Sequence, residues 1–124
     1  MQIHLTAAAK RFNQEWIFSN LDFSFATGHH YALIGNNGSG KSTLLQIIAG
    51  YIGLTKGQIN WENGMGETID AAKIYQEISI AAPYLELVEE LTALEQIAFH
   101  QQFKSIQPAL TPIQILEMQA KFYR

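Results

Sequence analysis

The chain is 124 residues long, which gives room for one domain with a buried core. Its net charge of −3 argues against nucleic acid as a main partner, and its lack of cysteine excludes disulfides and thiolate metal sites. The sequence has no secretory signal pattern and no apolar run near the roughly 20 residues of a membrane-spanning helix, so we expect a cytoplasmic protein that reaches a membrane only through a partner.

The first part of the chain alternates between apolar and polar side chains, which predicts strands with one buried face. The pattern runs over residues 3–7, gives way to a polar, turn-like stretch at 10–15, and resumes over 17–25. These segments predict a small antiparallel sheet. Residues 31–34 form a short apolar run, which is typical of a buried parallel strand.

The middle of the chain mixes helix and strand signals. Residues 44–49 are apolar apart from Gln46 and precede a glycine, which predicts a short helix. Residues 58–61 alternate again and predict a strand, and 69–76 predict a loop with a helical turn. Residues 78–82 indicate a second buried strand that Pro83 ends.

Two helices are predicted in the last third. Thr92 and Glu95 have the spacing of a capping box, which predicts a helix from there to about Phe103. Residues 111–114 repeat the signal, with Pro112 at the first helical position. The mixture of strands and helices indicates the α/β class.

A phosphate-binding motif lies between the predicted strand at 31–34 and the helix at 44–49. It fits the pattern G-x-x-x-x-G-K-[ST], and its residues are Gly35, Asn36, Asn37, Gly38, Ser39, Gly40, Lys41, Ser42 and Thr43. The glycines let backbone N–H groups converge on phosphate oxygens, and the helix N-terminus adds its positive dipole end. Lys41 would neutralise β- and γ-phosphates, Ser42 would bind the accompanying Mg²⁺, and Thr43 would add a donor. The alternative is a chance glycine-rich turn with an exposed lysine, and the strand and helix on either side favour the phosphate site.

With these residues the chain resembles the nucleotide-binding domain of ABC transporters. The similarity extends from about residue 3 to 103 and is most specific between Gly28 and Gly57. Its residues are Leu21–Phe25, Gly28, 32–45, 48–50, 57–59, Leu91, Thr92 and Glu95. The resemblance implies a P-loop NTPase fold with an antiparallel β subdomain, part of a parallel core and the start of a helical subdomain. It divides the chain at 1–82 and 83–124, and we expect these 124 residues to be a truncated part of a longer domain.

The resemblance also implies a place for the adenine ring of ATP. It puts Phe12 where an aromatic side chain stacks on the base, with Trp16 as the second candidate. Ordinary core packing of Phe12 is the alternative. Stacking alone, without hydrogen bonds to the base edge, implies modest discrimination between ATP and GTP.

The chain departs from the family pattern at the groups that support hydrolysis. The family's glutamine position falls on Pro83, and Glu86 or Glu89 would be weak substitutes. The sequence also lacks an apolar run ending in Asp-Glu, a Leu-Ser-Gly-Gly-Gln-like segment and a late switch histidine. His29, His30 and His100 are interpreted as surface residues. The sequence therefore predicts binding of Mg²⁺ and ATP, no catalytic residue, and negligible hydrolysis by these residues alone.

The resemblance implies the ATP-binding part of a transporter's motor subunit, which couples ATP binding and hydrolysis in the full-length protein to transport. Its partner would be a permease subunit in the inner membrane, and unpaired strand edges predict a homodimer or an exchanged assembly. Two alternatives stay open: an ABC-type ATPase outside transport, and a non-catalytic nucleotide-binding module. A GTPase is disfavoured because no Asn-Lys-x-Asp base reader is present.

Overall fold

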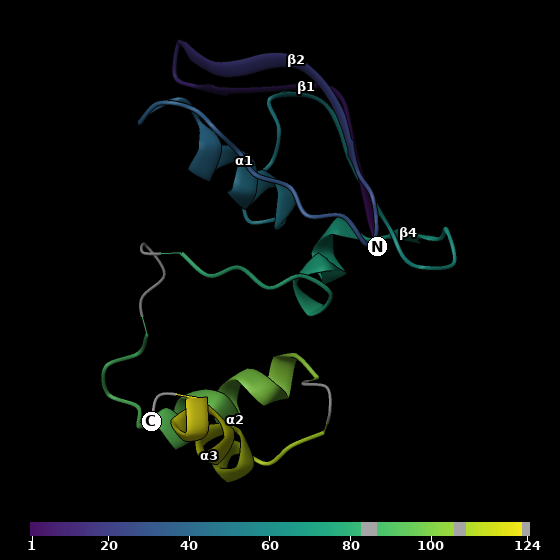
Figure 1. The fold of residues 1–124 in the computed structure, drawn as a ribbon. Helices are drawn as coiled ribbons and strands as arrows, with labels where there is room; N and C mark the ends of the chain where they lie inside the picture. Colours follow the sequence, from purple (N-terminus) through teal and green to yellow (C-terminus); the bar gives the residue numbers. More distant parts are fainter. Residues whose placement is uncertain (83–86, 106–108, 123–124) are drawn as a thin grey trace. The chain divides into compact units, whose positions relative to one another are not determined.

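Two compact units make up the chain, Met1–Ile78 and Ser79–Arg124 (Figure 1). The computed structural model describes residues 1–82, 87–105 and 109–122. Within these ranges no helix is both long and apolar enough to cross a membrane.

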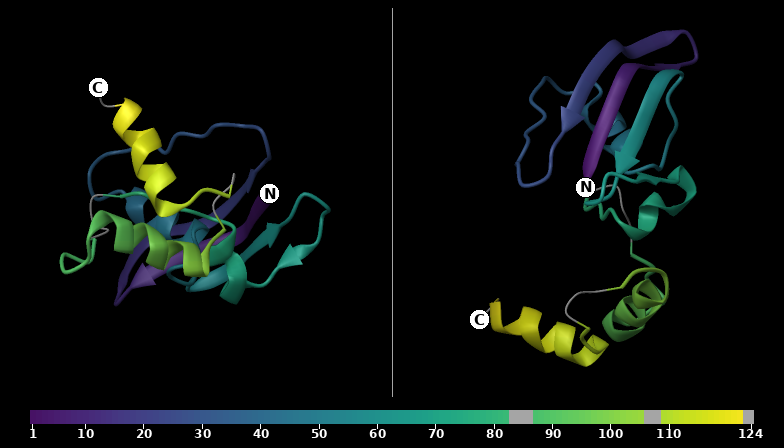
Figure 2. Two further views of the ribbon diagram at one scale, coloured as in Figure 1. Left: turned by 90° about the horizontal axis from the view of Figure 1, so that it is seen from below. Right: turned by 90° about the vertical axis from the view of Figure 1, so that its right-hand side faces the viewer.

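The first unit is built on a four-stranded antiparallel sheet in the order β2-β1-β3-β4 (Figure 2). Its strands confirm the alternation seen in the sequence at 3–7, 17–25 and 58–61. The first hairpin is longer than expected, because the predicted turn over 10–15 is reduced to two residues, and Asn13 takes a left-handed φ of 53°. The strands are β1 (Gln2–Phe12), β2 (Glu15–Phe25), β3 (Lys56–Glu62) and β4 (Thr68–Ile69).

A bulge interrupts β1 at Ala7. This residue has a φ of 45°, a left-handed value that is uncommon for a residue with a Cβ, and the register shifts against both neighbouring strands. Asp22 Oδ1 accepts the Ala7 N–H at 2.7 Å and so gives this amide a partner outside the ladder. Gly57 lies so close to the Ala7 carbonyl that a Cβ at position 57 would overlap it.

Helix α1 (Lys41–Ile48) covers one face of the sheet (Figures 1 and 2). It confirms the short helix predicted at 44–49, with an earlier start. Trp61 of β3 is 5% exposed and donates Nε1–H to the Ile48 carbonyl oxygen at 2.8 Å, which fixes the end of the helix to the sheet. The buried apolar residues are Leu5, Ala8, Ala9, Ile47, Ala49, Trp61 and Ile74. Ile74 comes from the 3-10 helix η1 (Ala71–Gln76), which is the helical turn predicted within 69–76.

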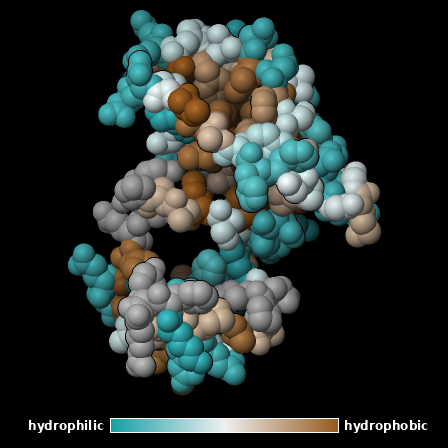
Figure 3. All heavy atoms as spheres, viewed as in Figure 1, coloured by the Kyte–Doolittle hydropathy of each residue, from teal (hydrophilic) through white to brown (hydrophobic). Residues whose placement is uncertain are grey.

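Two predicted strands, at 31–34 and 78–82, are wrong: neither is a strand in the part of the chain that the structure describes. A parallel strand needs a neighbour to complete its ladder, and all strand pairs among the described residues are antiparallel. The segment 31–34 instead contacts the end of β2 through its first residue, Tyr31. Its hydroxyl accepts the Ala26 N–H at 2.9 Å and its ring centroid lies 5.0 Å from that of Phe25. Ile34 is left 94% exposed, and Figure 3 shows further apolar side chains at the surface.

The second unit contains helices α2 (Ala93–Phe103) and α3 (Pro112–Phe122). The predicted capping box of α2 is confirmed, because Glu95 N–H donates to Thr92 Oγ1 and Thr92 N–H donates to the Glu95 carboxylate. The start of α3 is confirmed in the same way by reciprocal hydrogen bonds between residues 111 and 114.

Candidate functional site

The loop before α1 is shaped by glycines with left-handed backbones. Gly38 has a φ of 80° and Gly40 a φ of 92°, values that a residue with a Cβ rarely adopts. Ser39 N–H donates to the Asn36 carbonyl oxygen at 3.1 Å, which closes a tight turn. A Cβ at Gly40 would overlap the Ile17 side chain of β2, so the loop packs directly on the hairpin. Residues 35–40 of the motif therefore form the loop, and Lys41, Ser42 and Thr43 are the first residues of α1.

The N-terminus of α1 has the character of an anion site. Gly40 is the N-cap residue, no side chain caps the helix, and the first turn contains no acidic residue. The N–H groups of the first turn have no carbonyl partner within the helix, and the helix dipole makes this end partly positive. A phosphate group would satisfy both features at once.

Lys41 holds the turn together. Its Nζ donates to the carbonyl oxygens of Gly35 at 2.6 Å and Asn36 at 2.7 Å. The lysine side chain thus curls back over the loop from the first turn of α1. The ammonium group thus lies within the loop, where a phosphate would compete with these two carbonyl oxygens for its N–H donors.

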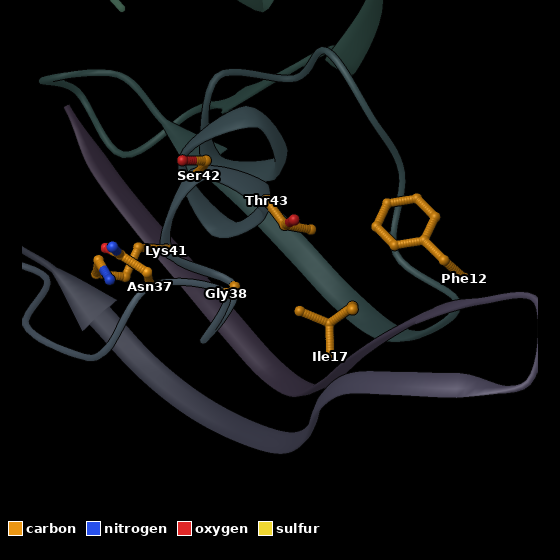
Figure 4. Close-up of a pocket in the computed structure, with 8 residues that line it drawn as sticks. Phe12, Ile17, Asn37, Gly38, Lys41, Ser42 and Thr43 are labelled. Atoms are coloured by element: carbon orange, nitrogen blue, oxygen red, sulfur yellow. The ribbon is translucent and has the colours of Figure 1, made fainter.

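A pocket of about 330 Å³ opens in front of the helix N-terminus. Figure 4 shows Phe12 and Ile17 approaching from the hairpin and Ser42 and Thr43 from the helix. The Lys41 ammonium is the one charged group among the lining residues, which are Phe12, Ile17, Asn37, Gly38, Gly40, Lys41, Ser42 and Thr43. The pocket thus combines an apolar side next to an aromatic ring with a polar, positively charged side. A nucleotide has the same two halves.

Seven of the residues predicted to bind the nucleotide line this pocket. Gly35 and Ser39 line a neighbouring pocket of about 220 Å³, and Asn36 turns its carbonyl oxygen toward Lys41. Ile17 was not predicted, and its place in an alternating strand is the signal that would have suggested a side chain on the packed face.

The second aromatic candidate, Trp16, is not a lining residue of this pocket. Its ring contacts two cations instead, with Arg11 Cζ at 5.2 Å and Lys56 Nζ at 5.5 Å from the ring centroid. Phe12, 46% exposed at the end of β1, is the aromatic residue that the structure brings to the pocket.

Metal and acid–base candidates elsewhere do not converge. No group of three metal-binding side chains exists among the described residues. His29 Nδ1 is paired with the Thr27 carbonyl oxygen at 3.1 Å, and His100 lies on α2 beside apolar residues. Glu89 is exposed, whereas Pro83 and Glu86 lie outside the described residues.

Comparison with known proteins gives consistent results. Residues 18–123 match the family model described as ABC transporter. The chain is 38% identical over 87 residues to the cytochrome c biogenesis ATP-binding export protein CcmA of Photobacterium profundum, which covers 68% of this chain and 39% of that protein. It is 35% identical over 99 residues to the ribose import ATP-binding protein RbsA of Bacillus cereus, with 78% of this chain and 20% of that protein covered. The chain thus spans about two fifths or less of the length of these relatives.

Proposed function

The chain belongs to the ABC transporter family, and on this basis we propose that it binds ATP with Mg²⁺ as the nucleotide-binding part of a transporter's motor subunit. Members of this family have the P-loop NTPase fold and bind ATP. The observation that carries the proposal is the pocket in which the uncapped N-terminus of α1, the Lys41 ammonium and the Phe12 ring meet.

Each half of the pocket has a task in this proposal. The backbone amides of residues 36–43 and the Lys41 ammonium bind the β- and γ-phosphates, because both provide positive charge to oxygens that carry negative charge. The Ser42 hydroxyl is a ligand for Mg²⁺ and Thr43 is a further donor. Phe12 stacks on the adenine ring through a face that needs no polar partner.

The proposal extends to partners. In the full-length protein ATP binding and hydrolysis would drive transport through a permease subunit, which would hold this cytoplasmic chain at the inner membrane. The relatives include both an export and an import protein, so the proposal does not depend on the direction of transport.

Calorimetry with Mg·ATP tests the proposal. We expect the wild-type chain to bind and Lys41→Ala to lose at least about tenfold in affinity, because a charge-assisted contact to phosphate disappears. Lys73→Ala is the matched control, since Lys73 is an exposed lysine of η1 in the same unit and should bind ATP as the wild type does. Absence of binding heat for the folded wild-type chain, or equal affinity for the two lysine variants, would contradict the proposal.

We also propose that the chain self-associates as a homodimer or an exchanged assembly through the segment 31–34. This segment has no strand partner among the described residues and carries the exposed Ile34. We expect light scattering to show a mass that rises with protein concentration, and Ile34→Lys to abolish the rise. Met65→Lys is the control, because Met65 is also strongly exposed but lies in the turn between β3 and β4. A monomer at every concentration would contradict this proposal.

A further inference from the structure

Lys10 connects the aromatic ring of the pocket to the segment that follows α1. Its Nζ lies 4.9 Å from the centroid of the Phe12 ring and donates to the Gly53 carbonyl oxygen at 2.7 Å. Lys10 and Phe12 are two residues apart on β1, and side chains at this spacing share a face of a strand. The ammonium is thus held by a backbone carbonyl while it also contacts the ring.

The segment that Lys10 reaches is fixed to the sheet at two further points. Thr55 N–H donates to the Ala9 carbonyl oxygen at 2.8 Å, and Arg11 N–H donates to Thr55 Oγ1 at 2.9 Å. Because α1 leads into this segment, these bonds join the helix that starts at the phosphate loop to the end of the strand that carries Phe12. Of the groups that form these bonds, the Lys10 ammonium is the one that also contacts the Phe12 ring.

We propose that Lys10 is a positioning residue that sets the plane of the Phe12 ring and thereby the nucleobase contribution to affinity; this rests on the function proposed above. Phe12 lies at the tip of a hairpin and is half exposed, so few contacts fix its ring. A cation on one ring face is attracted by the π-electrons and leaves the other face for a stacked base. Without the cation the Phe12 ring can rotate, and a stacking base must then restrict this rotation, which lowers its contribution to affinity.

Two ligands separate this role from phosphate binding. Mg·ATP uses both halves of the pocket, whereas inorganic tripolyphosphate with Mg²⁺ uses the phosphate half alone. We expect Lys10→Met, which keeps an apolar stem without the charge, to weaken ATP binding about three- to fivefold and to leave tripolyphosphate binding unchanged. Lys10→Arg restores most of the ATP affinity, because arginine keeps a cation over the ring.

Lys56→Met is the matched control. Lys56 makes the same kind of contact with Trp16, which does not line the pocket. Loss of the Lys56 charge should therefore change neither the affinity for ATP nor that for tripolyphosphate. Lys10→Gln keeps a donor for the Gly53 carbonyl oxygen but no charge, and it serves if the methionine variant does not fold. Lys10→Gln should also weaken the binding of ATP and leave the binding of tripolyphosphate unchanged.

The outcomes distinguish this inference from the proposed function. If the wild-type chain binds neither ATP nor tripolyphosphate, the proposed function fails and this inference with it. If the wild type binds both, equal losses for the two ligands in Lys10→Met or Lys10→Gln would show a structural role only. Unchanged ATP affinity in both variants would overturn the positioning role outright.

Discussion

Substitution of glycine by alanine at three positions of the first unit tests the geometry of the loop before α1. Gly38 and Gly40 belong to this loop, and Gly64, between β3 and β4, is the control. Gly40 combines a left-handed φ with a contact, because a Cβ there would overlap Ile17. Gly38 has the left-handed φ alone, with nothing within 4 Å of the added Cβ. Gly64 has neither feature. The series therefore separates backbone strain from steric overlap.

The expected magnitudes follow from these two terms. An alanine held at a left-handed φ costs about 1–2 kcal/mol, and forcing a methyl group into a packed contact costs about 1–3 kcal/mol. We therefore expect Gly40→Ala to lower the free energy of unfolding by about 2–5 kcal/mol and Gly38→Ala by about 1–2 kcal/mol. Gly64→Ala should be neutral or stabilising by up to about 1 kcal/mol, since it reduces the entropy of the unfolded chain.

Urea denaturation followed by circular dichroism measures these differences. The double variant Gly40→Ala with Ile17→Ala provides an internal check, because it removes the overlap and leaves the strain. The cost of Gly40→Ala should be smaller in the Ile17→Ala background than in the wild type. If Gly40→Ala and Gly38→Ala cost the same, or if the cost is unchanged by Ile17→Ala, the packing of the loop on the hairpin is not as described.

Three further predictions concern other parts of the fold. Hydrogen bonds from the Thr92 backbone and side chain lower the pKa of the Glu95 carboxyl group below its ordinary 4.5. The carboxylate therefore stabilises the fold above pH 4.5, and this stabilisation is lost as the pH falls through the pKa of the folded state. In thermal denaturation, the difference in Tm between wild type and Glu95→Gln should be smaller at pH 3 than at pH 7. Trp61→Phe removes the donor to the Ile48 carbonyl oxygen and should cost about 2 kcal/mol in urea denaturation. Asp22→Ala removes the acceptor at the β1 bulge, and we expect a loss of about 1 kcal/mol and faster hydrogen exchange of the bulge amide.

The parts of the fold that depend on neighbouring residues were predictable from sequence. A capping box places its two partners within one turn, so Thr92 and Glu95 were enough to locate the start of α2. The loop before α1 is similar, because glycine at positions 38 and 40 permits the left-handed backbone angles that the structure has there. Alternation likewise predicted β1, β2 and β3, although it did not predict the bulge, which depends on a carboxylate from another strand.

Whether residues 31–34 form a strand could not be decided from neighbouring residues in the sequence. An apolar run shows that a segment can be buried as a strand, but the strand itself exists only with a ladder partner, and that partner is a tertiary property. The same limit applies to the pocket. The contact of Ile17 with Gly40 and that of Lys10 with Gly53 join residues far apart in the chain. The sequence could indicate the chemistry of the side of the pocket proposed to bind phosphate, whereas the arrangement of the side proposed to bind the base required the folded sheet.

The hydrogen bond from Trp61 to the end of α1 has a practical consequence for spectroscopy. The chain contains two tryptophans, and they occupy opposite environments: Trp61 is almost fully buried, whereas Trp16 is 43% exposed. A blue-shifted emission component that iodide does not quench would therefore belong to the indole docked on the helix, and a quenchable component to the hairpin tip. Detachment of the helix from the sheet could then be followed in real time without an added fluorophore.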